Sequence, residues 1–318
     1  MTRRVVVTDQ SFGSVEQERA VAERAGAQFT EHQCRGEEEA AAAVAGADVA
    51  FVNFAPMTER VLRGMAPGAT VIRYGIGVDN VDLDAARALG VSVANVPDYG
   101  SDTVADHAAA SLLALLRKLP SYDRAVRDQG WISAPTLSPL PGFRSTTIGL
   151  VGTGRIGLAL HDRLVPFGFT VIAYDPYADP AVLAERGIER VDLPELLARS
   201  HGISLHAPLT DQTRHLIDAG ALARMRPGAV LVNTARGGLV DSEALADALA
   251  DGRLGGAALD VVDPEPLPAD SRLRQLPGVL LTPHAAFFSD DSIANLQRLA
   301  SEEAARALAG QPLRCPVA

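Results

Sequence analysis

Short apolar runs alternate with helical patterns along the whole chain of 318 residues. In the first hundred residues, the runs that predict buried strands are VVV (5–7), ADVAFVN (47–53), TVIRYG (70–75) and VSVANV (91–96). The patterns that predict helices lie between these runs, at 15–26, 37–46, 58–65 and 82–90. Alternation of this kind predicts a parallel sheet with helices on both faces.

A second series of the same kind begins at TTIGLVG (146–152). Its predicted strands are IGLV (148–151), TVIAYD (170–175), GISLHA (202–207), AVLVNTA (229–235), GAALDVV (256–262) and GVLLTP (278–283). Residues 101–119 predict a helix that is apolar on most of its circumference, so we expect it to be buried between two bodies as the chain crosses from one domain to the other. The last 30 residues predict one more long helix, which we expect to return to the first domain because chain termini are often close together.

The composition is that of a soluble globular protein, with 47% hydrophobic and 21% charged residues. The net charge is −10 and no basic stripe is visible, which argues against nucleic acid or a membrane surface as a partner. No apolar run has the length of a signal peptide or of a membrane span, so we expect a cytoplasmic protein. Two cysteines, Cys34 and Cys315, do not make a disulfide scaffold and are interpreted as free thiols.

A glycine motif follows the predicted strand at 148–151 and opens a helical pattern. In Gly152-Thr-Gly154-Arg-Ile-Gly157, one glycine makes the tight turn, one admits a pyrophosphate, and one allows close packing of helix and strand. The helix N-terminus offers N–H groups to phosphate. Asp175 ends the next strand, 18 residues after Gly157, where a carboxylate accepts hydrogen bonds from ribose hydroxyls. A 2′-phosphate would be repelled there, so the motif predicts NAD rather than NADP.

Two residues of different chemistry follow two further predicted strands. Arg236 comes directly after the run at 229–235, and a guanidinium at this end of an open α/β sheet can hold a carboxylate with paired hydrogen bonds. His284 follows the run at 278–283, and a histidine can donate a proton near neutral pH. A substrate with a carboxylate to be bound, a carbonyl to be polarised and an oxygen to be protonated would need both residues.

Four sequence blocks carry a resemblance to a known family. They are RYGIGVDNVDL (73–83), GLVGTGRIG (149–157), NTARGGLVD (233–241), and ALDVVDPEPL (258–267) followed by LTPHAAF (281–287). In order and spacing the chain resembles the D-isomer-specific 2-hydroxyacid dehydrogenases. VPDYGSDTVADHA (96–108) and HAAFFSDDS (284–292) are most similar to the branch that includes phosphoglycerate dehydrogenases and the C-terminal-binding-protein corepressors.

The resemblance implies an α/β fold with two doubly wound parallel-sheet domains. A Rossmann NAD-binding domain, residues 100–289, would be inserted into a flavodoxin-like substrate domain, residues 1–99 and 290–318. It also implies a homodimer built mainly through the NAD domain and its 120–145 loop. A cleft between two domains would close on substrate, and we expect its hinges near residues 98–102 and 286–291.

The implied activity is NAD-dependent interconversion of a small 2-oxo acid and its D-2-hydroxy acid. By resemblance, Arg236 orients the substrate, His284 is the general acid and base, and Glu265 hydrogen-bonds the other ring nitrogen of His284. The residues expected to contact NAD are Thr103, Gly152, Gly154, Arg155, Ile156, Gly157, Asp175, Pro176, His206, Ala207, Pro208, Thr213, Thr234, Ala235, Arg236, Asp260, His284 and Ala286. The residues expected to contact substrate are Asn53, Phe54, Tyr74, Ile76, Gly77, Arg236 and His284.

Two alternative functions stay open at this point. One is a 3-phosphoglycerate dehydrogenase, although Asn53 and Phe54 stand near the place where such enzymes tend to carry an arginine. The other is an NADH-responsive binding protein, like the corepressors, with little turnover. No cluster of residues has the spacing of a metal site. We interpret His107 as a packed or capping residue, His206 as a residue that positions backbone, and Trp131 as a packing residue.

Overall fold

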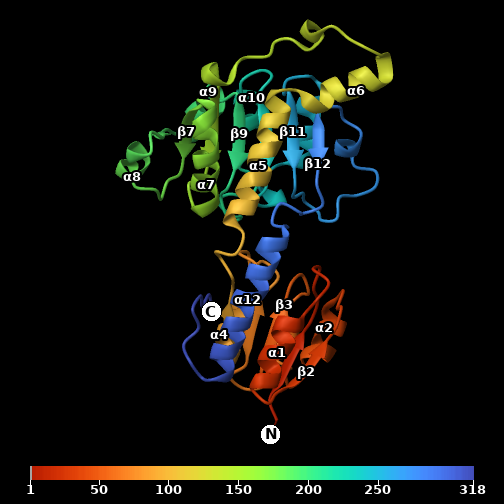
Figure 1. Cartoon of the computed structure of the whole chain (residues 1–318), viewed down its shortest axis with the longest axis vertical. Helices are drawn as coiled ribbons and strands as arrows, with labels where there is room; N and C mark the ends of the chain where they lie inside the picture. Colours follow the sequence, from red (N-terminus) through yellow and green to blue (C-terminus); the bar gives the residue numbers. More distant parts are fainter. Residues whose placement is uncertain (1) are drawn as a thin grey trace. The chain divides into compact units, whose positions relative to one another are not determined.

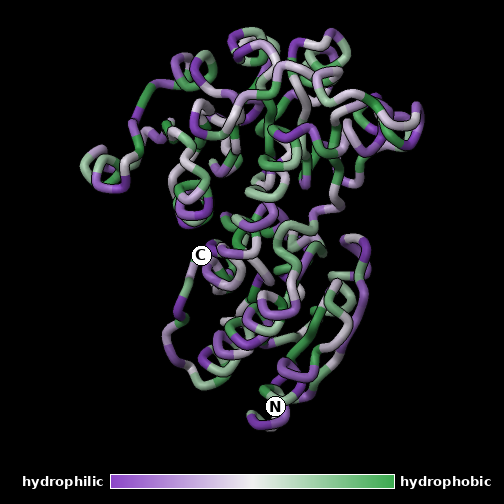
Figure 2. The backbone as a smooth tube through the Cα atoms, turned by 45° about the horizontal axis from the view of Figure 1, so that its top comes forward, coloured by the Kyte–Doolittle hydropathy of each residue, from purple (hydrophilic) through white to green (hydrophobic). Residues whose placement is uncertain are grey.

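The computed structural model describes residues 2–318, which form two compact units. Unit 1 contains residues up to 100 together with 288–318, and unit 2 contains residues 101–287. Each unit is a parallel sheet with helices on both faces, and the strands carry many of the hydrophobic residues (Figures 1 and 2). The predicted α/β class is confirmed.

Unit 1 has a five-stranded parallel sheet in the order β2-β1-β3-β4-β5. Its strands are β1 (Arg4–Val7), β2 (Gln28–Glu31), β3 (Val49–Val52), β4 (Thr70–Arg73) and β5 (Ser92–Ala94). This is the flavodoxin-like strand order. The sequence patterns did not predict β2, because its residues QFTE are polar or half-exposed and pair with β1 alone.

Five helices cover the two faces of this sheet (Figure 1). They are α1 (Glu16–Arg24), α2 (Glu37–Val44), α3 (Glu59–Leu62), α4 (Leu83–Leu89) and α12 (Asp290–Leu308). Side chains of α1 and α12 pack with Val5, Val7 and Phe51 on one face. Helices α2, α3 and α4 pack on the other face against Val6 and Val71. Such a sheet buries apolar side chains on both sides, which explains its continuous apolar strands.

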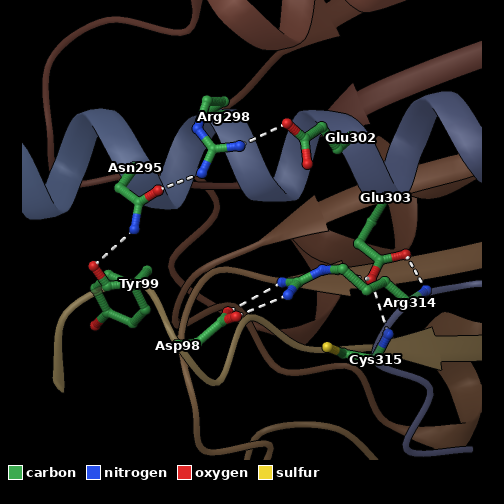
Figure 3. A network of polar contacts seen from close by, with 8 residues as sticks. All are labelled: Asp98, Tyr99, Asn295, Arg298, Glu302, Glu303, Arg314 and Cys315. Atoms are coloured by element: carbon green, nitrogen blue, oxygen red, sulfur yellow. Dashed lines mark hydrogen bonds and ion pairs between the residues drawn. The ribbon is translucent and has the colours of Figure 1, made fainter.

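The final residues of the chain are not helical, contrary to the single long helix predicted for the last 30. Helix α12 ends at Leu308, and the chain returns to the sheet, where Pro316 forms an antiparallel bridge with Ala94. The carboxylate of Glu303 is fully buried and accepts hydrogen bonds from the backbone N–H groups of Arg314 and Cys315, each at 2.9 Å (Figure 3). Arg314 in turn binds Asp98 through two hydrogen bonds, at 2.7 and 3.0 Å. These contacts tie the end of the chain to unit 1.

Unit 2 has a seven-stranded parallel sheet in the order β12-β11-β10-β9-β6-β7-β8. Its strands are β6 (Thr147–Val151), β7 (Thr170–Tyr174), β8 (Glu189–Arg190), β9 (Gly202–Leu205), β10 (Val230–Asn233), β11 (Gly256–Leu259) and β12 (Val279–Leu281). The first six strands have the Rossmann order, and β12 extends the sheet at one edge. The patterns missed β8, an exposed edge strand of two residues.

Helices cover both faces of the second sheet as well. They are α5 (Ser101–Leu116), α6 (Leu119–Gln129), α7 (Arg155–Leu164), α8 (Pro180–Glu185), α9 (Leu193–Arg199), α10 (Ala219–Arg224) and α11 (Ser242–Ala250). Short 3₁₀ helices are η1 (Ala134–Leu137), η2 (Phe143–Ser145), η3 (Val165–Phe167), η4 (Gly237–Leu239) and η5 (Arg272–Arg274). Helices α5 and α7 pack on one face, and α9, α10 and α11 on the other. The buried side of α5 therefore lies on the sheet of unit 2.

The helix predicted over 101–119 ends early, because Lys118 has a left-handed backbone with φ of 52°. Helix α6 then begins at Leu119 and contains no buried residue. Trp131, interpreted from the sequence as a packing residue, does not pack within the described chain, since its side chain is 94% exposed after α6. We call residues 119–142 the arm. No helix formed by residues 2–318 has both the length and the apolar character needed to cross a membrane.

Candidate active site

The turn between β6 and α7 carries the glycine motif. Gly152 has φ of +95°, and a Cβ added to it would lie 2.8 Å from the backbone carbon of His206. A Cβ on Gly157 would lie 2.3 Å from the carbonyl oxygen of Gly152. Neither position admits a side chain, so α7 begins close to the ends of β6 and β9. Its first-turn N–H groups are thereby available to an anion at the carboxyl end of the sheet.

Asp175, at the end of β7, is bound to the glycine turn. Its Oδ2 atom accepts hydrogen bonds from the backbone N–H and the hydroxyl of Thr153, both at 2.8 Å. Its Oδ1 atom accepts from the backbone N–H groups of Tyr177 and Ala178, at 3.0 and 3.2 Å. Burial opposes ionisation here, but these hydrogen bonds outweigh it and hold the pKa of Asp175 below its ordinary value. The carboxylate is thus negative at neutral pH.

The other residues expected to contact NAD follow strands of unit 2 or lie in the first turn of α5. Thr103 is on α5, Pro176 follows β7, His206, Ala207, Pro208 and Thr213 follow β9, Thr234, Ala235 and Arg236 follow β10, Asp260 follows β11, and His284 and Ala286 follow β12. The carboxyl ends of parallel strands share one edge of a sheet, which gathers these residues. The hydroxyl of Thr234 is buried and has no hydrogen-bond partner within residues 2–318. The glycine cradle and this unsatisfied hydroxyl both fit a bound dinucleotide.

The backbone and Cβ of His206 lie against the glycine turn. Its Nε2 atom lies 2.9 Å from the hydroxyl of Ser204. Loss of hydration lowers the pKa of His206 to about 4, so the ring is neutral at physiological pH. His206 therefore supports the turn through its backbone and Cβ, and its neutral ring does not supply a proton.

Arg236 stands on a turn that is fixed by a buried asparagine. The side chain of Asn233 donates to the carbonyl oxygen of Arg236 at 2.9 Å and accepts from the N–H of Ala235 at 3.0 Å. Asn233 itself has no exposed surface. Arg236 donates through Nη1 to the carbonyl of Ala235 at 2.7 Å. These bonds set the direction in which the guanidinium leaves the end of β10.

The next residue, Gly237, brings the turn against the loop that carries Glu265. A Cβ on Gly237 would lie 2.0 Å from the backbone carbon of Val262. Only glycine allows the two backbones to approach this closely. The Arg236 turn and the Glu265 loop are therefore held side by side.

His284 and Glu265 form a hydrogen-bonded pair, with 2.9 Å between Nδ1 and Oε2. The other carboxylate oxygen of Glu265 accepts from the backbone N–H of Val262 at 3.1 Å. Burial would raise the pKa of Glu265, but the hydrogen bond and charge of His284, the Val262 N–H and the charge of Arg236 together lower it. With Nδ1 bonded to a carboxylate, Nε2 is the ring atom left to exchange a proton with a substrate.

Asp260 holds the loop on which His284 lies, a role that the sequence patterns did not reveal. Its carboxylate accepts from the Thr282 hydroxyl at 2.5 Å and from the backbone N–H groups of Ala285 and Ala286 at 2.7 and 2.9 Å. Its backbone carbonyl accepts from the N–H of His284 at 2.8 Å. Asp260 is buried, and its carboxylate accepts these hydrogen bonds from the loop that carries His284. The only sequence signal is an aspartate directly after a buried strand.

His107, interpreted from the sequence as a packed or capping residue, belongs to the same network. From α5, its Nε2 atom lies 3.2 Å from the hydroxyl of Thr282. Thr282 in turn donates to Asp260. Since Thr282 lies 175 residues further along the chain, no local pattern could have predicted this contact.

The substrate residues predicted in unit 1 differ in how far their side chains can reach. Phe54 and Ile76 are exposed at the ends of β3 and β4. Asn53 is buried and donates to Ser11 at 3.0 Å, and Tyr74 is buried with its hydroxyl donating to Glu18 at 2.8 Å. Both side chains hydrogen-bond within unit 1, so a contact of Asn53 or Tyr74 with substrate stays a prediction. Gly77, beside Ile76, offers backbone alone.

A metal centre was not expected from the sequence. Within residues 2–318, no three His, Cys, Asp or Glu side chains are grouped as metal ligands.

Several known proteins are similar to this chain in sequence and fold. Residues 109–286 match the family model for the NAD-binding domain of D-isomer specific 2-hydroxyacid dehydrogenases. The D-3-phosphoglycerate dehydrogenase of Mycobacterium tuberculosis is 42% identical over 271 residues, which cover 85% of this chain and 51% of that protein. The chain thus spans about half the length of the curated relatives that it matches.

Solved structures match over nearly the full length of the chain. The TT0316 protein of Thermus thermophilus is 35% identical with a TM-score of 0.89, covering 99% of this chain and 100% of that one. The D-lactate dehydrogenase of Aquifex aeolicus, solved with NAD and lactic acid, is 26% identical with a TM-score of 0.87, covering 96% of each chain. The chain belongs to the D-isomer specific 2-hydroxyacid dehydrogenase family, and its cofactor is NAD.

Proposed function

We propose that this protein interconverts a small 2-oxo acid and its D-2-hydroxy acid, with NADH and NAD⁺ as the redox pair. The observation that carries the proposal is the His284–Glu265 hydrogen bond of 2.9 Å at the strand ends that also carry Arg236. A histidine paired with a carboxylate and a nearby guanidinium supply the proton and the anion-binding group that the reaction needs.

The cofactor, when bound, supplies a hydride to C2 of the oxo acid. Arg236 binds the substrate carboxylate and polarises the carbonyl through its planar set of donors. His284 donates the Nε2 proton to the carbonyl oxygen as it becomes a hydroxyl, and in the reverse direction it accepts that proton. Glu265 stabilises the imidazolium and fixes the ring. Overall, one oxo acid, one NADH and one proton give one hydroxy acid and one NAD⁺.

Asp175 is the residue that we propose binds the adenosine ribose. Its two oxygens already accept four hydrogen bonds, one of them from the hydroxyl of Thr153. That hydroxyl can rotate away, so a ribose hydroxyl can take its place without a change of backbone. The negative charge of Asp175 disfavours a 2′-phosphate and therefore NADP.

Unit 1 is the proposed substrate domain and unit 2 the proposed NAD domain. The backbone N–H groups of Ile76 and Gly77, in the turn after β4, are proposed to bind the substrate carboxylate as a nest of donors. A homodimer and a cytoplasmic location complete the proposal. The exposed apolar residues of the arm, which include Leu119 and Trp131, support the homodimer.

The experiment is NADH oxidation with a panel of 2-oxo acids, followed by absorbance. We expect turnover with at least one acid and formation of the D enantiomer of the product. NADH binding without oxidation of NADH by any acid would instead support the alternative of an NADH-responsive binding protein.

A further inference from the structure

Helix α5 and the loop of His284 are the two ends of unit 2. The first residue of α5, Ser101, is also the first residue of that unit, and the chain leaves the unit after Phe287, shortly beyond His284. His107 of α5 and Thr282 at the start of the loop are 175 residues apart in the chain. A contact between them therefore joins the segment on which the chain enters the unit to the segment on which it leaves.

A side-chain hydrogen bond makes this contact. The Nε2 atom of His107, in the second turn of α5, lies 3.2 Å from the hydroxyl oxygen of Thr282, directly after β12. Thr282 donates its single hydroxyl proton to the carboxylate of Asp260, across 2.5 Å. The hydroxyl oxygen can then only accept from His107, which requires a proton on Nε2. A neutral His107 ring is thereby held in its Nε2–H tautomer.

From Thr282 the contacts continue to the backbone of His284. The Asp260 oxygen that accepts the Thr282 proton also accepts the N–H of Ala285, at 2.7 Å. The backbone carbonyl of Asp260 accepts the N–H of His284 at 2.8 Å. Because the backbone of His284 is left-handed, with φ of 53°, its position depends on contacts of this kind. A change in the direction of the Thr282 hydroxyl therefore disturbs the bonds that hold the proposed proton donor.

We infer that His107 is a positioning residue for the proposed proton donor. Its Nε2–H holds the Thr282 hydroxyl toward Asp260, and Asp260 in turn holds the backbone that carries His284. The helix on which the chain enters unit 2 thus fixes the loop on which it leaves. His107 acts through these residues and not on the substrate. The inference rests on the proposed function for the role of His284.

The first test removes the donor and keeps the approximate volume of the side chain. His107→Leu has no N–H group, whereas His107→Gln offers an amide N–H in place of the ring Nε2–H. We expect kcat of His107→Leu to fall by about 10-fold, because a small displacement of a catalytic group slows the chemical step. His107→Gln should recover most of that loss. The loss in His107→Leu should appear equally in kcat and kcat/KM, since substrate binding is not changed.

The matched control is His201→Leu, which removes a hydrogen bond of another histidine in unit 2. His201 accepts from the backbone N–H of Thr147 at 3.0 Å, just before the amino end of β9. The amino ends of the strands lie at the edge of the sheet opposite to His284. This variant should lose stability and keep the kcat of the wild type, which separates a general loss of stability from a loss of position.

The second test establishes whether His107 acts through Thr282. Thr282→Val removes the hydroxyl, and Thr282→Ser keeps it. In protein that already carries Thr282→Val, His107→Leu should lower kcat no further, because the contact between the two residues is already lost. Thr282→Ser should keep most of the wild-type kcat. Losses that multiply in the double variant would overturn the route through Thr282.

Hydrogen exchange separates a failure of this inference from a failure of the proposed function. The N–H groups of His284, Ala285 and Ala286 all donate to Asp260, so their exchange rates, measured by NMR without substrate, report on the loop itself. We expect about 2- to 10-fold faster exchange at these amides in His107→Leu, the effect of one weakened hydrogen bond. His107→Gln and His201→Leu should exchange there as the wild type does.

The two assays together decide the outcome. If the wild type reduces no 2-oxo acid but His107→Leu shows the faster exchange, the proposed reaction is wrong and the positioning contact stands. Exchange in His107→Leu that equals the wild type would overturn the inference. Wild-type kcat in this variant of an active enzyme, or equal losses in His107→Leu and His107→Gln, would overturn it as well.

Discussion

His284 has a left-handed backbone with φ of 53°, which a non-glycine residue adopts only where its surroundings hold it. Asp260 supplies that hold by accepting hydrogen bonds from the N–H groups of Ala285 and Ala286 and from the Thr282 hydroxyl. The strained residue is also the proposed acid and base. At the scale of the residue, the position of the proposed proton donor therefore depends on a buried carboxylate that need not touch the substrate.

Asp260→Asn should lower kcat by about 100-fold, because an amide cannot accept all three hydrogen bonds and a small misplacement of a catalytic group has an effect of that size. The affinity for NADH, measured by fluorescence, should change much less than kcat. Asp218→Asn is the control, since Asp218 also accepts a backbone N–H bond, at the start of α10. A wild-type kcat for Asp260→Asn would contradict the role given to Asp260.

His206 predicts a particular dependence of stability on pH. Its pKa is about 4 in the folded protein, against an ordinary value near 6.5. Between these values the unfolded chain binds a proton that the folded protein does not. The stability from the neutral ring is therefore complete above pH 6.5 and is lost as the pH falls toward 4, by at most about 3 kcal/mol.

His206→Gln should remove this part of the pH dependence. Urea unfolding at several pH values between 4.5 and 7 measures the free energy of unfolding for the wild type and the variant. We expect the difference between the two proteins to shrink as the pH falls. A difference that is constant across this range would mean that His206 does not titrate as described.

At the scale of the element, the site depends on how closely two loops approach. Gly237 lets the Arg236 turn lie against the loop at Val262, three residues before Glu265. Gly152 and Gly157 do the same for α7 and the end of β9. Each contact joins the ends of different strands, so the sheet alone would not fix the distance between Arg236 and the His284–Glu265 pair.

Gly237→Ala tests the close approach of these loops. The added Cβ would lie 2.0 Å from the Val262 backbone, so the loops must separate. We expect a loss of about 1–3 kcal/mol in the free energy of unfolding and a large fall in kcat/KM. Gly142→Ala is the control, because nothing lies within 4 Å of a Cβ at that position. Equal stability and activity of the two variants would show that the approach is not required.

The elements that the sequence predicted correctly are those marked by a pattern among neighbouring residues. Buried strands such as β3 and β10 have continuous apolar runs, and the ends of such strands located Arg236 and His284. The edge strands β2 and β8 were missed because they are short and partly exposed, so they lack that signal. The exposure of Trp131 was not predicted, because a large apolar side chain is buried only where its segment packs against the rest of the protein. Trp131 follows α6, which contains no buried residue.

The parts of the site that the sequence could not predict depend on contacts between distant residues. The bond between His107 and Thr282, and the return of residues 309–318 to β5, join segments far apart in the chain. A glutamate between two prolines, as at Glu265, has no local pattern that separates a loop carboxylate from a partner of histidine. The resemblance to a family, and not the periodicity of the chain, supplied that pairing.

At the scale of the whole molecule, the arm is the part of unit 2 whose helix α6 buries no residue against the sheet of that unit. Helix α6 has no buried residue, and Leu119, Val126 and Trp131 are exposed along it and just beyond it. Apolar side chains in such number on one segment indicate a protein interface. The proposed homodimer would bury them.

Replacement of Leu119 and Trp131 by serine should shift the protein from dimer to monomer. Sedimentation velocity measures the mass of the particle directly. The control is Tyr177→Ser, which removes an equally exposed aromatic side chain in the loop after β7. A wild-type protein that sediments as a monomer, or a double variant that stays a dimer, would contradict the role of the arm.

NADH oxidation with a 2-oxo acid by the wild type, His284→Asn and Glu265→Gln tests the proposed proton donor most directly. We expect turnover by the wild type and a loss of about 10²–10⁴-fold in kcat for His284→Asn, the range of general acid catalysis. We expect a smaller loss for Glu265→Gln, with NADH affinity retained in both variants. Wild-type kcat in His284→Asn would contradict the assignment of His284 as the proton donor.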